Sequence, residues 1–442
     1  MSSDLRDRLV DLAEEAPAAV AAGRDLWQTG VRRHRRRRVA AVATTTAVLL
    51  VVGVLGSLRP PETPSPDPAE APPSELHLPR TVHAPSPWAE STRDAGPPGP
   101  LAVVSLASRN RPDGLTGTWQ ATEPYGVSAL DGSAVFLDLP GGRTEEGYQL
   151  GYGTMALSPN GRKVGFTHFA QDPGAAFPHI IGWDVYDTVS GEITELRVPG
   201  MPEIRGIDVF EMRFTGDSRY LLTNYSPTGS DGSRQDALVA WDVETGERVV
   251  VEGTGHHWLP DPGSAPEGVV WSRDRRIFTF HPGTGQTEVA TMPNEVVTAS
   301  FGPDGRALAY VGHRPSKPNE AVPWHLYAGE SVDALARVPG LAPGLLLGWR
   351  GVHEVVVEGP GRGVQFVDVR TGEYTTSSLS LPRERFMGPL YAADLWRNPL
   401  VEGVEPSAAP DPRWWLRPPL WVASALLALA GLLVARRRRA RA

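Results

Sequence analysis

Histidines near acidic residues are the parts of this sequence best suited to chemistry, because imidazole and carboxylate groups bind metal ions and transfer protons. His168 and His179 flank a stretch that contains Asp172, so these three side chains could meet at the tip of one loop. His256 and His257 are adjacent, and neighbouring residues of a strand point to opposite faces, which is poor geometry for one metal ion. We expect surface or hydrogen-bonded histidines at both places and no metal site.

Motifs of the common enzyme classes are absent from the sequence. His353 is followed by Glu354, but the second histidine of a zinc-peptidase helix is missing. There is no Gly-x-Ser-x-Gly elbow, no phosphate-binding loop and no dinucleotide-binding fingerprint. The chain also lacks cysteine, which excludes thiolate metal sites, cysteine nucleophiles and disulfides. We therefore expect no cofactor and no enzymatic activity.

Aspartate and glycine recur at fixed spacing between apolar stretches, where they serve structure. An apolar strand ending in Asp, a short turn ending in Gly and a further strand form one repeated unit. In such a turn the carboxylate accepts backbone N–H bonds, and glycine adopts the left-handed conformation at no steric cost. The structural turn residues are Asp187, Gly191, Asp242, Thr245, Gly246, Asp368, Thr371 and Gly372.

A second unit, a tight hairpin, alternates with the first. It consists of two apolar strands around a turn rich in Pro, Asp, Asn and Gly, at residues 155–166, 212–222 and 299–310. Together the two units give four strands per repeat, which is typical of propeller blades. We predict an all-β fold, a β-propeller of about six four-stranded blades, with a closing strand from residues 386–396. The predicted blades lie near residues 101–150, 151–198, 208–252, 254–291, 296–338 and 344–378.

The hairpin turns also carry a family resemblance. WD-repeat and TolB-like propellers have Ser-Pro-Asp-Gly-Arg in the corresponding turn, and the matching stretches here run from Ser158 to Arg162 and from Gly302 to Arg306. With a membrane segment on either side, the chain resembles the propeller-bearing membrane proteins of high-GC actinobacteria. The resemblance implies the fold and implies no activity.

Two apolar segments without charge, residues 39–58 and 418–435, are long enough to cross a bilayer as helices. Arginines cluster just before the first segment and just after the second, and the positive-inside rule places such clusters in the cytoplasm. Two tryptophans precede the second segment, as expected at the headgroup level. The residues that set this topology are Arg35, Arg36, Arg37, Arg38, Trp414, Trp415, Arg436, Arg437, Arg438 and Arg439.

This topology predicts a two-pass protein of the cell membrane with both termini in the cytoplasm. A cytoplasmic basic tail with a short amphipathic helix (1–38) precedes the first transmembrane helix (39–58), and a Pro-rich extracytoplasmic linker (59–100) follows it. The propeller occupies residues 101–396, and a second linker (397–417) leads to the second transmembrane helix (418–435) and a cytoplasmic basic tail (436–442).

A rigid propeller with uneven loops and no catalytic motif favours an extracytoplasmic binding or assembly module. Its expected partners are the lipid bilayer and a protein or other component of the cell envelope. Nucleic acid is not expected, because the net charge is -8 and the acidic charge falls between the two basic ends. A signalling protein that couples outside binding to its N-terminal segment is an alternative, and a propeller enzyme is a third.

The longest loops, residues 170–179, 225–236 and 312–323, each join the second to the third strand of a predicted blade. Because strand direction alternates within a blade, we expect these loops to gather on one face of the propeller. The candidate binding residues on that face are Asp172, His179, Tyr225, Asp231, Arg234, His313, Arg314 and Lys317.

Overall fold

The computed structural model describes most of residues 75–413 and a few residues beyond them. Its gaps are residues 115–116, 143–153, 171–178, 198–203, 206–208, 226–236, 253–262, 267, 282–283, 314–322, 360–362 and 380–388, and residues 426–428 and 430–431 are also described. The chain divides into two compact units, and the larger unit, Ala69–Asp411, contains all the described strands. The first predicted membrane segment (39–58) and both basic tails lie outside the described residues.

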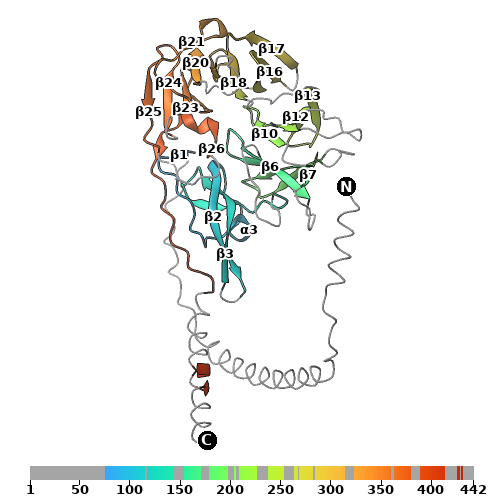
Figure 1. Cartoon of the computed structure of the whole chain (residues 1–442), viewed down its shortest axis with the longest axis vertical. Coiled ribbons are helices and arrows are strands. Elements are labelled where there is room, and N and C mark those ends of the chain that lie inside the picture. Colours follow the sequence, from blue (N-terminus) through green and yellow to red (C-terminus); the bar gives the residue numbers. More distant parts are fainter. Residues whose placement is uncertain are drawn as a thin grey trace, which may run out of the picture. The chain divides into compact units, whose positions relative to one another are not determined.

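The larger unit is a ring of six antiparallel sheets (Figure 1). Blade 1 consists of β26 (Leu390–Tyr391), β2 (Leu101–Asp113), β3 (Gly117–Ser128) and β4 (Ala134–Phe136). Blade 2 consists of β5 (Met155–Leu157), β6 (Lys163–Ala170), β7 (His179–Asp187) and β8 (Ile193–Leu196), with β9 (Ile204–Arg205) beside β7. Blade 3 consists of β10 (Val209–Phe214), β11 (Tyr220–Tyr225), β12 (Ala237–Asp242) and β13 (Arg248–Glu252). Blade 4 consists of β14 (Gly263–Ala265), β15 (Gly268–Arg273), β16 (Arg276–His281) and β17 (Gly285–Thr291). Blade 5 consists of β18 (Glu295–Phe301), β19 (Leu308–His313), β20 (His325–Gly329) and β21 (Ala336–Arg337). Blade 6 consists of β22 (Leu346–Arg350), β23 (Glu354–Glu358), β24 (Val364–Asp368) and β25 (Tyr374–Thr376). The prediction of an all-β propeller with six four-stranded blades is confirmed.

Large apolar side chains fill the spaces between neighbouring blades. Trp183 of β7 and Trp241 of β12 are fully buried in one apolar cluster, with ring centroids 5.8 Å apart. Trp271 of β15 is also buried and stacks on Phe278 of β16 at 4.4 Å. Alternating residues of a strand face opposite sides of its sheet, so both faces of a central strand need apolar residues for this packing.

The ring closes where its last strand joins its first blade. Residues Leu390 and Tyr391 of β26 pair with two residues of β2, which makes the C-terminal strand the innermost strand of blade 1. The predicted closing strand is thus present. The 3-10 helix η3 (Ala393–Arg397) follows, and its buried Trp396 donates from Nε1 to the carbonyl of Leu347 in blade 6 at 3.0 Å. Trp396 therefore ties blade 6 to the closing strand.

The chain enters and leaves the propeller through a shared clasp. Strand β1 (Leu78–Pro79) pairs in parallel with β27 (Leu400–Val401), and the Asn398 side chain donates to the Leu76 carbonyl at 2.6 Å. Leu78 is fully buried. We use the name clasp for β1, β27 and this hydrogen bond.

The two linkers are shorter than the sequence indicates. Residues 75–100 of the expected linker 59–100 fold onto the propeller, and they include the short helix α3 (Thr92–Ala95). Residues 398–402 of the expected linker 397–417 also belong to the folded part, as half of the clasp. Leu78 and Val82 explain the difference, because both are buried against the core of blade 1 although prolines surround them in the sequence. High proline content suits an edge strand as well as an extended spacer.

Helices are few in the part of the chain that the structure describes, and none of them is long and apolar enough to cross a membrane. Residues 426–428 and 430–431, within the predicted segment 418–435, are helical.

Replacing Trp396 with alanine is expected to destabilise the folded protein by about 3–5 kcal/mol, because a buried aromatic side chain is lost where the ring closes. The measurement is urea unfolding followed by circular dichroism. Trp324, which is 41% exposed just before β20, provides the matched control. Trp324→Ala should cost less than about 1 kcal/mol. Equal losses in the two variants would show that Trp396 does not secure the closure.

Candidate functional site

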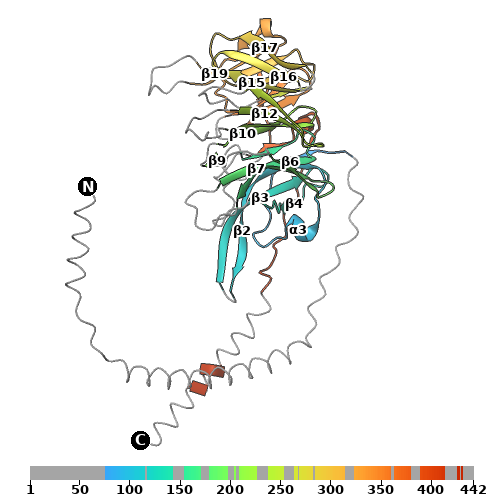
Figure 2. The ribbon, with the colours of Figure 1, turned by 90° about the vertical axis from the view of Figure 1, so that its right-hand side faces the viewer.

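Two faces of the ring differ in their connections. The predicted long loops do join second to third strands, β6 to β7, β11 to β12 and β19 to β20. The ends of second strands and the starts of third strands lie on one side, which we call the long-loop face. The tight turns between third and fourth strands lie on the opposite side, which we call the turn face. Figure 2 shows the ring from its edge, so that its two faces lie on the left and right of the view.

Few of the predicted loop residues lie within the described part of the chain. His313 ends β19, and its Nε2 lies 3.4 Å from Glu295 Oε2. His179 and Tyr225 are described in the backbone alone, at the start of β7 and the end of β11. The remaining predicted residues lie outside the described residues: Asp172, Asp231, Arg234, Arg314 and Lys317.

His168 takes part in a polar cluster that the sequence did not predict. In the strand register His168 lies opposite Gly182, whereas His179 lies opposite Ala170. The partner of His168 is Asp184, whose Oδ2 lies 2.6 Å from His168 Nδ1. Within the described residues, no group of three or more His, Cys, Asp and Glu side chains is arranged to hold a metal ion.

Arg197 completes this cluster at the long-loop side of blade 2. Its Nη1 donates to Asp184 Oδ1 at 2.7 Å and to the Trp183 carbonyl at 2.6 Å, and its Nη2 lies 2.7 Å from His168 Nδ1. Asp184 is 1% exposed, so Arg197 and His168 both contact a buried carboxylate. One ring nitrogen cannot donate to Asp184 and accept from Arg197 at once. Whether Nδ1 carries a hydrogen therefore decides which contact is a hydrogen bond.

The backbone between blades 1 and 2 passes close over the His168 ring. Gly141 has a φ of +85°, and a Cβ at this position would lie 2.5 Å from His168 Cε1. The Gly141 carbonyl also accepts from the Phe169 amide at 2.8 Å. Glycine is thus required there for two reasons, the left-handed backbone and the contact with imidazole.

A second buried carboxylate lies in blade 1. Glu123 of β3 is 1% exposed and accepts from Arg109 Nη1 at 3.0 Å and from Arg111 Nε. The Arg109 guanidinium also lies over the Phe136 ring, 5.0 Å from its centroid. Two cations share one carboxylate here, so this cluster carries a net positive charge.

A signal for both carboxylates is present in the sequence. Asp184 follows Trp183 inside an otherwise apolar strand, and Glu123 lies between the apolar residues Ala121 and Tyr125. A charged residue in a buried strand needs a charged partner, because an unpaired buried charge is very costly. The identity of the partners depends on the register between strands, which the sequence of a single strand does not specify.

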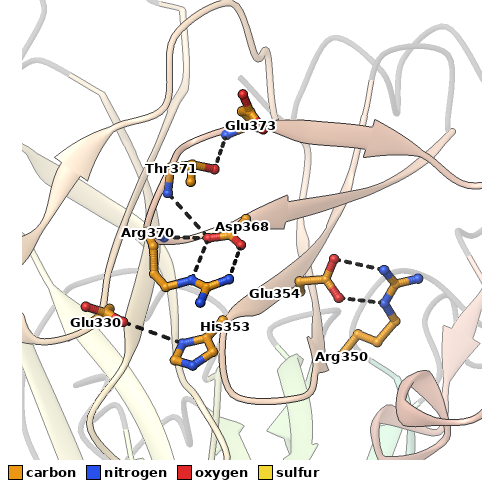
Figure 3. A network of polar contacts seen from close by, with 8 residues as sticks. All are labelled: Glu330, Arg350, His353, Glu354, Asp368, Arg370, Thr371 and Glu373. Carbon is orange, nitrogen blue, oxygen red and sulfur yellow. Dashed lines mark hydrogen bonds and ion pairs between the residues drawn. The ribbon is translucent and has the colours of Figure 1, made fainter.

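Polar residues of the turn face bond to one another (Figure 3). Asp368 Oδ1 accepts from the Arg370 amide at 2.8 Å, and the Arg370 guanidinium beside Asp368 lowers the pKa of this carboxyl to about 2. Glu354 pairs with both Nε and Nη2 of Arg350 at 2.8 Å. His353 Nδ1 lies 3.7 Å from Glu330, an ion-pair distance and too long for a hydrogen bond. His353 and Glu354 therefore contact different partners.

The other Asp-Gly turns have similar geometry. Asp187 Oδ1 accepts from two amides at 2.8 Å, and Asp242 Oδ1 accepts from two amides at 3.0 and 3.2 Å. Thr245 and Thr371 each accept from an amide two residues later at 3.2 Å. The turn glycines have φ values of +80°, +74° and +72° at Gly191, Gly246 and Gly372. The side-chain oxygens of these residues thus bond to the backbone of their own turns.

Among known proteins, only solved structures match this chain, and the similarity is one of fold. No protein-family model matches the sequence, and no curated protein sequence matches it. Among solved structures, an oligogalacturonate lyase in complex with manganese is 15% identical over 66% of this chain and 77% of that chain, with a TM-score of 0.39. A chain of a nidogen/laminin complex is 15% identical over 66% and 99%, with a TM-score of 0.40. Dipeptidyl peptidase 4 of Porphyromonas gingivalis is 15% identical over 51% and 39%, with a TM-score of 0.33. Similarity at this level says nothing of activity.

Asp184→Asn is expected to lower the free energy of unfolding by about 1–3 kcal/mol, because Arg197 and His168 lose their buried anion. Urea unfolding measures the change. Glu195 is a matched control, since it lies 3.6 Å from the same guanidinium but its side chain is 67% exposed. Glu195→Gln should cost less than about 0.5 kcal/mol. A loss in Asp184→Asn no larger than in the control would contradict the assigned role of Asp184.

Proposed function

We propose that this protein is a binding module whose long-loop face recognises a component of the cell envelope. The observation that carries this proposal is the difference between the two faces of the ring. On the turn face, Asp and Gly residues form short turns that are hydrogen-bonded internally. On the long-loop face, longer connections join the second and third strands of blades 2, 3 and 5, and long loops on a rigid scaffold commonly carry binding residues.

Side chains on the long-loop face support this assignment. Three large apolar residues lie at that end of their blades and remain exposed: Trp119 (36%), Ile181 (39%) and Trp324 (41%). Two partly buried cations lie in blades 1 and 2, where the side chains of Arg109 and Arg197 are 15% and 29% exposed. Exposed aromatic residues next to oriented cations are typical of binding surfaces.

Membrane anchoring is the second part of the proposal. The charge-free segments 39–58 and 418–435 would hold the protein in a bilayer, with the propeller outside and both ends inside the cell. The clasp supports this arrangement, because β1 and β27 bring both ends of the propeller to one place. Two spans from one place can enter the same membrane without distorting the ring.

Within this proposal the protein is not an enzyme. The resemblance to propeller-bearing membrane proteins of actinobacteria agrees with a role in the cell envelope, and the partner is expected to be a protein or another envelope component. The cationic groups that could assist catalysis are instead held by Glu123 and Asp184.

Replacing the three long loops, residues 171–178, 226–236 and 314–322, with short Gly-Ser turns is expected to abolish partner capture. The measurement is chemical cross-linking in native membranes followed by mass spectrometry. A matched variant carries replacements in the turns after Asp187, Asp242 and Asp368, on the opposite face. That variant should retain its partners, and a cross-linking pattern unaffected by the loop replacements would refute the assigned face.

Topology is tested by single cysteines, which the cysteine-free chain makes easy to read. A cysteine at Ser65 should react with an impermeant thiol reagent on intact cells whose wall has been removed. Cysteines at Ser3 and Ala442 should react only after the cells are opened, because both ends are expected inside. Labelling of the terminal cysteines in intact cells, with Ser65 protected, would reverse the topology.

A further inference from the structure

The β2–β3 hairpin of blade 1 extends well beyond the rest of its sheet. Strand β26 pairs with β2 only at Val103 and Val104, and β4 pairs with β3 only at residues 125–127. Residues 105–113 and 117–124 therefore continue as a two-stranded ribbon. Figures 1 and 2 both show β2 and β3 projecting from the ring. We call this part the ribbon.

One face of the ribbon carries a row of aromatic and guanidinium groups. Strand pairing places Arg109 opposite Ala121 and Arg111 opposite Trp119, so these residues share a face with Glu123. Towards the ring, Arg109 lies over the buried ring of Phe136. Away from the ring the row ends at Trp119, which is 36% exposed.

Glu123 holds both arginines in place. It is 1% exposed and binds Arg109 and Arg111 at once, so the two guanidinium groups lose little further freedom when a ligand arrives. Their side chains are 15% and 27% exposed and thus remain accessible to a ligand from the solvent. Two positive charges share one negative charge.

Asp113 is the remaining charge on this face. It lies two residues beyond Arg111, exposed at the tip of the ribbon. Water screens charges at the tip strongly, whereas the arginines lie nearer the core, where screening is weaker. An anionic group is therefore favoured beside the arginines and disfavoured at the tip.

We propose that this face of the ribbon binds acidic glycans whose sugar rings carry carboxylates. The indole of Trp119 offers a flat apolar surface to the C–H face of a pyranose ring, and Arg111 and Arg109 offer paired N–H donors to its carboxylate. This inference rests on the proposed binding function and names its ligand class. An acidic peptide would satisfy the arginines but would not use the exposed apolar surface of the indole.

The test uses isothermal titration calorimetry with the purified full-length protein in detergent. The probes are hexasaccharides of hyaluronan and alginate, which carry uronates, and hexa-N-acetylchitohexaose (chitohexaose below), a neutral oligomer of the same length. We expect the protein to bind at least one uronate probe. Its affinity for chitohexaose should be about tenfold lower, because one charge-assisted contact is missing.

Variants separate the two parts of the site. Trp119→Ala should weaken uronate binding by about tenfold through loss of stacking, and Trp119→Phe should retain most of it. Arg111→Gln should weaken uronate binding and leave chitohexaose unchanged. Asp113→Asn should strengthen uronate binding, because it removes a repulsive charge. Tyr374→Ala, at a tyrosine of β25 that is 41% exposed on the turn face, is the control and should change nothing.

Absence of uronate binding, or binding that Trp119→Ala leaves intact, would overturn the glycan site. Equal binding of hexaglutamate, again without dependence on Trp119, would assign an acidic peptide instead. Neither result touches the wider proposal, because cross-linked partners that depend on the long loops would still support the binding function.

Discussion

Closure of the ring by a strand from the far end of the chain is the constraint on which the rest of the structure depends. Only two residue pairs join β26 to β2, and a pairing this short is weak alone. The hydrogen bond from Trp396 to blade 6 and the clasp add contacts on either side of it. These contacts close a loop of about 300 residues, whose entropic cost is only a few kcal/mol larger than for a short loop. A few buried groups are therefore enough to offset the entropic cost of closing the ring.

Carboxylates have different roles on the two faces: those of the turn face fix turns, and those of the long-loop face orient arginines. Asp187, Asp242 and Asp368 accept backbone amides, so each fixes the turn that follows it. Asp242 and Asp368 also accept from Arg219 and Arg370, whose side chains are more than half exposed. Glu123 and Asp184 instead accept from side chains, so each orients an arginine whose own surface stays partly open. A carboxylate bonded to backbone stabilises a turn. A buried carboxylate bonded to arginine also orders a cation beside the solvent.

Sequence predicts the features of this fold that arise between near neighbours. The Asp-Gly turns and alternating apolar strands are local, and they were enough to give six blades and the strands that the long loops connect. Burial of Leu78 was not predictable in this way, because its partner Leu400 lies more than 300 residues away. The pairing of His168 with Asp184 depends on the register of two strands across a loop. Composition alone indicated an extended spacer where the clasp forms.

The clasp packs against blade 1, the blade that carries the ribbon, and this has a mechanical consequence. The amide of Asn110 in the ribbon donates to the carbonyl of Pro87, and the amide of Ala409 donates to Ser86 Oγ. The segments that enter and leave the propeller are thus bonded to each other, and the entering one to the ribbon. A force applied to the ribbon would therefore be shared between the body of blade 1 and these segments. Because strand β2 also carries the short β26–β2 pairing, part of that force reaches the closure along the same strand.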